Sequence, residues 1–191
     1  MTQPSSAPGA ARRWAEALVA ASTGRRALIA LAVFVVFTAT VLPWQAGIAA
    51  QYSEGVGSPD TSLWYSAHRL YELAEAYGAE GRAAYVRARV TFDVVWPLVY
   101  TAMLALALGW LLHRASEPLA RMRLLVLLPI GALLADYAEN ACTAIVMARW
   151  PEATDLLAAL APAFTAAKWT LLGAAFLAVP VLGLLAVRRS R

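Results

Sequence analysis

Four long apolar runs constrain this sequence more than any other feature. They cover about residues 27–48, 90–112, 124–147 and 162–187. A helix needs about 20 mostly apolar residues to cross a bilayer, and only helices or closed barrels satisfy the backbone there. Short polar connections separate the last three runs, which favours antiparallel neighbours. The sequence therefore predicts an all-α integral membrane protein, an antiparallel bundle of four transmembrane helices.

Composition excludes several classes of protein. Hydrophobic residues make up 61% of the 191 residues and charged residues 15%, which is outside the range of soluble globular domains. The net charge of +4 comes from basic residues that bracket the apolar runs, so we expect no nucleic-acid partner. Cys142 is the one cysteine, which excludes an internal disulfide and thiol-redox chemistry. We expect no cofactor.

The chain divides into a tail and one transmembrane domain. Residues 1–24 are expected to form a cytoplasmic tail that is disordered or lies at the membrane interface, and residues 25–191 form the domain. Gly47 and Ala49 resemble a signal-peptidase site at the end of the first run. That run is longer than the roughly 7 to 15 apolar residues of a signal peptide, which favours a retained span.

The segment between the first two spans predicts a surface helix over about residues 61–77. Apolar residues recur there at helical spacing, namely Leu63, Ala67, Leu70, Ala74 and Tyr77. This pattern is typical of an amphipathic helix lying on the extracytoplasmic face of the membrane. His68, Glu72 and Glu75 share one face of it, but they offer too few donors in ligand geometry, so we predict a solvated face and no metal site.

The basic residues predict the orientation. Ten of them fall on the side of the two termini: Arg12, Arg13, Arg25, Arg26, Arg114, Arg121, Arg123, Arg188, Arg189 and Arg191. Five fall on the other side: Arg69, Arg82, Arg87, Arg89 and Arg149. The positive-inside rule then places both termini in the cytoplasm and residues 51–89 outside the cell (plasma or inner) membrane.

Three polar residues interrupt the third apolar run. Asp136, Glu139 and Asn140 share one helical face. An ionisable side chain at the centre of a membrane helix costs roughly 2.5 to 3.5 kcal/mol, so such residues are usually paired, functional or both. We predict that they line a site, although a polar network that only holds the helices together remains the alternative.

A second polar stripe enters the membrane with the second span. Its members are three or four residues apart and predict one continuous helical face: Arg82, Tyr85, Arg89, Asp93, Trp96 and Tyr100. Arg82 and Arg89 would meet an anionic headgroup at the mouth of a pocket. The alternative is an ordinary interfacial belt in which the arginines reach the lipid phosphates.

Lys168 supplies a basic group within the fourth run. Counted at about 1.5 Å per residue, its depth matches that of Glu139, which predicts an ion pair between them. Asp136 is expected to bond Tyr100 or Asn140, or to be protonated. The candidate ligand-binding set is therefore Asp136, Glu139, Asn140, Lys168, Asp93, Tyr100, Trp96, Arg82 and Arg89.

These residues favour a multi-pass protein with an outward-facing polar pocket that binds or transports a small amphiphilic molecule or lipid. One alternative is an intramembrane lipid-modifying enzyme that uses a carboxylate as acid or base. Another is a structural subunit, in which the small residues Gly131, Ala132, Ala135, Ala138 and Ala141 let a partner helix approach. Membrane lipid is the expected surrounding, and both a homo-oligomer and a partner membrane subunit stay open.

Overall fold

The computed structural model describes residues 9–53, 55–59, 62–115 and 121–188, and of residues 187 and 188 only the backbone. These residues contain helices and no strand. In chain order the helices are α1 (Ala10–Ala21), α2 (Gly24–Ser53), α3 (Ala67–Ala76), α4 (Gly78–Val90), α5 (Phe92–His113), the 3-10 turn η2 (Arg123–Leu127), α7 (Leu128–Arg149) and α8 (Asp155–Arg188).

Four helical segments in the described part of the chain are long and apolar enough to cross a membrane. They are Gly24–Ser53, Gly78–His113, Arg123–Arg149 and Asp155–Ala186. This confirms the four predicted runs, each of which lies within one segment except for residue 187 at the end of the fourth run. The helices extend beyond the apolar runs because hydropathy marks the part that suits lipid, whereas backbone hydrogen bonding continues through the polar ends.

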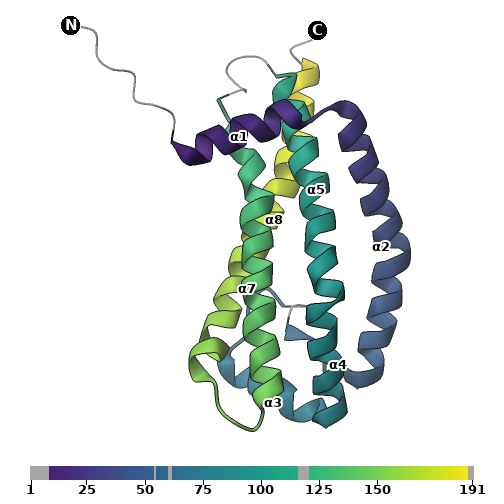
Figure 1. The fold of residues 1–191 in the computed structure, drawn as a ribbon, viewed down its shortest axis with the longest axis vertical. Helices are drawn as coiled ribbons and strands as arrows, with labels where there is room; N and C mark the ends of the chain where they lie inside the picture. The colour runs from purple at the N-terminus through teal and green to yellow at the C-terminus, as the bar shows by residue number, and fades with distance from the viewer. Residues whose placement is uncertain (1–8, 54, 60–61, 116–120, 189–191) are drawn as a thin grey trace, which may run out of the picture.

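The four long segments lie side by side along the long axis of the molecule, with α1 across one end and α3 at the other (Figure 1). The most extensive packing is between α7 and α8. α2 packs along α5 and α4 and only marginally against α8. Most of the apolar surface of α2 is exposed, as with Leu28 and Val36, which suits a helix surrounded by lipid.

α1 packs against the bundle. Its Ala15 and Val19 are buried against α5 and η2, whereas Trp14 on the other side is 70% exposed. Ser22, which follows α1, is buried and lies against Gly109 of α5. The part of the predicted tail that is expected to be disordered, residues 1–8, lies outside the described residues.

The polar stripe of the second span is divided between two helices, which corrects the prediction of one continuous helix. α4 ends at Val90, α5 begins at Phe92, and Thr91 forms a turn between them. The Thr91 hydroxyl donates to the Arg87 carbonyl at 2.7 Å, and its backbone N–H bonds Ala88 in a tighter turn. Such side-chain hydrogen bonds offer the backbone an alternative to a regular helix.

α3 is shorter than the predicted surface helix of residues 61–77. It begins at Ala67 because the Ser66 hydroxyl accepts a hydrogen bond from the backbone N–H of Arg69, at 3.1 Å, and so caps the helix. Leu70 and Leu73 are buried with residues of α7 and α8. The apolar face of α3 therefore contacts protein.

Tyr71 fastens the loop between α7 and α8 to α3. Its hydroxyl donates to Asp155 Oδ1 at 3.1 Å and accepts from the backbone N–H of Thr154 at 2.8 Å. We expect Tyr71→Phe to lower the free energy of unfolding by about 1 to 2 kcal/mol, because both bonds are lost at once. Thermal unfolding in detergent checks this, and a midpoint equal to that of wild type would contradict it.

Candidate functional site

α7 carries the polar stripe that the sequence predicts, and the protein interior covers it. Asp136, Glu139, Asn140 and Thr143 are exposed by 7%, 1%, 5% and 1%. The Thr143 hydroxyl donates to the Glu139 carbonyl at 3.0 Å, which satisfies it within its own helix. The three longer side chains are left to meet neighbouring helices.

Lys168 of α8 meets Glu139 at the centre of this stripe. The Lys168 Nζ atom lies 2.5 Å from Glu139 Oε2, and the two side chains are 7% and 1% exposed. This confirms the predicted pair. α8 begins at Asp155 rather than near Pro162, so Lys168 lies deeper in its helix than the sequence indicated.

Asp136 accepts two hydrogen bonds from neutral groups. The Tyr100 hydroxyl donates to its Oδ2 at 2.9 Å, and the Asn140 amide donates to its Oδ1 at 3.0 Å. The sequence offered Tyr100 or Asn140 as a partner of Asp136, and the structure has both bonds. Lys168 Nζ lies further away, at 3.8 Å from Asp136 Oδ1, so this lysine lies between two carboxyl groups and closer to Glu139.

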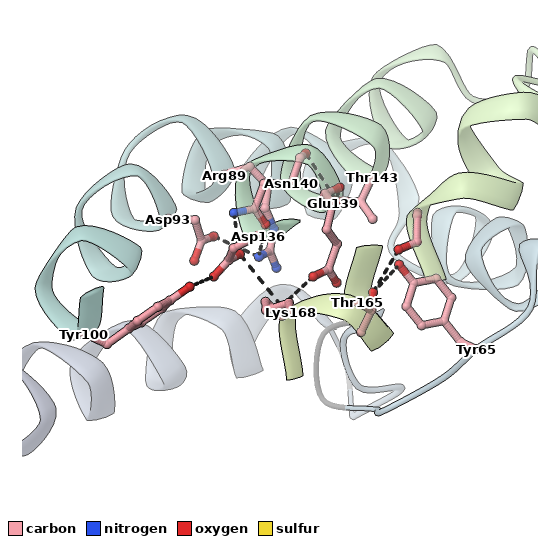
Figure 2. A network of polar contacts seen from close by, with 11 residues as sticks. Tyr65, Arg89, Asp93, Tyr100, Asp136, Glu139, Asn140, Thr143, Thr165 and Lys168 are labelled. Carbon is pink, nitrogen blue, oxygen red and sulfur yellow. Dashed lines mark hydrogen bonds and ion pairs between the residues drawn. The ribbon is translucent and has the colours of Figure 1, made fainter. Parts of the chain in front are cut away.

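Arg89 joins the second stripe to the first. Its Nη1 lies 2.9 Å from Asp93 Oδ2 and donates to Asn140 Oδ1 at 3.1 Å, while its guanidinium lies over the Tyr85 ring at 4.3 Å. Asn140 therefore accepts from Arg89 and donates to Asp136. Figure 2 shows these groups from α4, α5, α7 and α8 as one connected cluster. We call it the polar network; its members are Arg89, Asp93, Tyr100, Asp136, Glu139, Asn140 and Lys168.

A cavity of about 500 Å³ lies against the polar network. Four charged residues of the network form its polar wall: Arg89, Asp93, Asp136 and Lys168. The remaining lining is aromatic or apolar and comes from α2, α5 and α8: Leu42, Phe92, Trp96, Tyr100, Trp169 and Leu172. We call this the inner cavity; its lining combines charged side chains with aromatic and apolar ones.

A second cavity of about 390 Å³ adjoins the first. The two share Leu42, Arg89, Phe92 and Asp93, so the Arg89–Asp93 ion pair lies on the boundary between them. The second cavity continues along the last turns of α2 to the loop at Gly57. The second cavity therefore lies between that end of the molecule and the Arg89–Asp93 ion pair, with the inner cavity on the other side of this pair.

The structure brings together eight of the nine predicted site residues and separates Arg82 from them. Arg82 Nη1 donates to the Ala74 carbonyl at 2.8 Å and lines a different cavity of about 380 Å³, beside Met147 and Trp150. Arg82 is separated from the other site residues because a stripe of residues winds around the helix axis, and because α3 packs against this part of α4. A headgroup-binding role for Arg82 would therefore belong to another cavity.

Sequence analysis missed four lining residues, Leu42, Phe92, Trp169 and Leu172. Trp169 and Phe92 each adjoin a predicted site residue along the chain, which was a usable signal. Leu42 and Leu172 resemble every other leucine in a membrane span. Their role depends on which helices are neighbours, and no local pattern records that.

The network can hold a polar head by hydrogen bonds and charge, and the aromatic wall can hold apolar groups. In the described part of the chain no three His, Cys, Asp or Glu side chains gather in a way that could hold a metal ion. No known protein family, curated protein or solved structure matches this chain.

Proposed function

We propose that this multi-pass membrane protein binds a small amphiphilic molecule or lipid in the inner cavity, for transport or sensing. Asp136 and Lys168 form the polar wall, supported from behind by Glu139 and Asn140. Trp96 and Trp169 form part of the less polar lining. The ligand's head would contact the former and its apolar part the latter.

The arrangement of the ends supports an outward-facing site in an antiparallel bundle. α1 packs on η2 and on α5 at one end of the molecule, and the arginines near these elements include Arg12, Arg25 and Arg123. By the positive-inside rule this end is cytoplasmic. The cavity that leads to the polar network opens toward the other end, where the second cavity reaches Gly57. In this topology α3 lies at the extracytoplasmic interface.

One observation carries the proposal: five ionisable side chains line or adjoin a cavity of about 500 Å³ inside the bundle. Interhelical hydrogen bonds in membranes contribute only about 0.6 kcal/mol on average, less than the cost of burying the charges. A bundle that needed only stability would close this space with apolar side chains. The volume lies within the range of small-molecule sites, about 300 to 1,000 Å³.

The small residues of α7 favour this function over recognition of a partner helix. Ala132 and Ala135 are buried within the chain, and a Cβ atom at Gly131 would lie 3.2 Å from Leu171 of α8. The close approach at Gly131 is therefore used by α8 of the same chain, whereas Ala141 is exposed. This supports a site inside one bundle.

The test is native mass spectrometry of the full chain extracted in mild detergent, with wild type beside Asp136→Asn. We expect a defined small-molecule adduct on wild type that is at least tenfold less abundant on the variant, since the aspartate charge contacts the ligand's head. Glu80→Gln is the matched control, because it removes the same charge at an exposed position of α4. It should retain the adduct.

Circular dichroism shows whether both variants keep the helical content of wild type. Equal adducts on wild type and on a folded Asp136→Asn protein would overturn the proposal. A bare wild-type chain that stays bare after addition of extracted membrane lipid would also overturn it.

A further inference from the structure

We infer that the head of the ligand carries a single positive charge, as in an amphiphilic amine or quaternary ammonium. This inference rests on the proposed function and names the ligand class of the same cavity. Three independent features support it: the balance of charge in the polar network, the aromatic lining of the inner cavity, and the position of this cavity between the weakly packed helices α2 and α8.

Within the described network, three carboxyl groups are joined to two basic groups. Arg89 lies 2.9 Å from Asp93, and Lys168 lies 2.5 Å from Glu139. Asp136 accepts from the Tyr100 hydroxyl and the Asn140 amide, and Lys168 Nζ lies 3.8 Å from it. A carboxylate that accepts at both oxygens is satisfied in its ionised form. Counted with all three carboxyl groups ionised, the network carries one net negative charge beside the cavity.

A buried net charge is costly unless an opposite charge accompanies it. Arg89 and Lys168 already have close carboxylates, so an anionic head would meet bases that are neutralised and would add to the excess negative charge. A monocation in the inner cavity beside Asp136 would balance the cluster. The charges therefore select a cation over an anion.

Aromatic rings around the inner cavity suit the same ligand. Trp96, Tyr100, Phe92 and Trp169 all line it. Trp96 is held in place by stacking on Phe34 and Phe37, with ring centroids 5.7 and 5.5 Å apart. Aromatic faces attract ammonium groups, most strongly for tryptophan and more so where water is excluded. Lys168 Nζ lies 5.4 Å from the Trp169 ring centroid, which is a cation–π contact within the chain.

The helices beside the inner cavity explain why the ligand is amphiphilic. Leu42 of α2 and Leu172 of α8 both line it, yet α2 packs only marginally against α8. Phe34 and Phe176 bridge these two helices by their rings, at a centroid distance of 6.3 Å. A hydrocarbon chain attached to the head can lie between the helices and reach the bilayer, where apolar groups are stable.

The experiment uses the full chain in phosphatidylcholine nanodiscs and three probes that share a dodecyl chain. The probes are dodecyltrimethylammonium, the net-neutral dodecyldimethylamine N-oxide, and dodecyl phosphate. Each is titrated as a mole fraction of the lipid, and native mass spectrometry reads the fraction of protein that carries one probe molecule. We expect half-occupancy by the ammonium probe at a mole fraction at least tenfold lower than for either of the others.

Variants of the chain show which residues cause the preference for the ammonium probe. Asp136→Asn should weaken binding of the ammonium probe to the level of the N-oxide probe, and it should leave binding of the N-oxide probe unchanged. Glu80→Gln should change the binding of neither probe. Trp169→Leu should raise the mole fraction of ammonium probe needed for half-occupancy about threefold, since one cation–π contact is lost. Trp169 is 39% exposed, so this variant tests the site even if Asp136→Asn fails to fold.

The experiment distinguishes failure of the cationic ligand class from failure of the proposed binding function. Equal binding of the ammonium and N-oxide probes, or preference for the phosphate, would overturn the cationic class while the cavity remains a binding site. Absence of binding by all three probes, together with a wild-type chain that retains no lipid, would overturn the proposed function as well.

Discussion

Lys168→Met is expected to lower the free energy of unfolding by about 3 to 5 kcal/mol, because removing one member of a buried ion pair leaves the opposite charge uncompensated. Lys168 lies between Glu139, at 2.5 Å, and Asp136, at 3.8 Å. The variant removes the one basic group that both carboxyl groups share. Reversible unfolding in mixed micelles measures the loss.

Glu139→Gln is expected to lower the free energy of unfolding less than Lys168→Met does, by about 1 to 3 kcal/mol. This is the range for leaving a buried polar group without a good hydrogen bond. Lys168 keeps Asp136 nearby in this variant, and the glutamine fills the space of the glutamate. The difference between the two single variants therefore measures how Lys168 is shared. Equal losses would show that Asp136 contributes nothing to holding the lysine.

The paired replacement Lys168→Met with Glu139→Gln supplies the control. Removing both charges of a buried pair is often far less damaging than removing one. We expect the double variant to be more stable than Lys168→Met alone. If the double variant loses as much unfolding free energy as the two single variants added together, the two side chains do not interact in the protein.

Gly109→Ala is expected to lower the free energy of unfolding by about 1 to 3 kcal/mol, the usual cost of forcing an extra group into a packed site. A Cβ atom at this position would lie 2.7 Å from the Cβ atom of Ser22 and closer still to its Oγ. Ser22 cannot yield easily, because it is buried and its hydroxyl donates to the Leu18 carbonyl at 2.7 Å. The variant should therefore displace α1 from α5.

Two readouts test this displacement. Thermal unfolding gives the stability, and limited trypsin cleavage at Arg12 and Arg13 of α1 gives its exposure. Gly173→Ala is the matched control, because a Cβ there meets nothing within 4 Å and alanine favours a helix by up to about 1 kcal/mol. Adding Ser22→Gly should restore much of the stability of Gly109→Ala. If the Gly109 and Gly173 variants behave alike, α1 does not pack on α5 as described.

The polar residues show how far the sequence could predict the site. Asp136, Glu139 and Asn140 stood out because an apolar run makes every charge in it conspicuous, and their spacing put them on one face. Lys168 could be paired with Glu139 by counting rise along two helices. Spacing alone groups Arg82 with Arg89, but the packing of α3 gives Arg82 a different neighbour, the Ala74 carbonyl.

By itself, the sequence determined the four apolar segments and the polar face of α7, because hydropathy and helical periodicity are local properties. Tertiary structure alone decided the turn at Thr91, the packing of α1 on Gly109, and the inner cavity between Leu42 and Trp169. Those features depend on how closely helices distant in the chain approach each other. That distance is set by side-chain packing between helices, which no single segment contains.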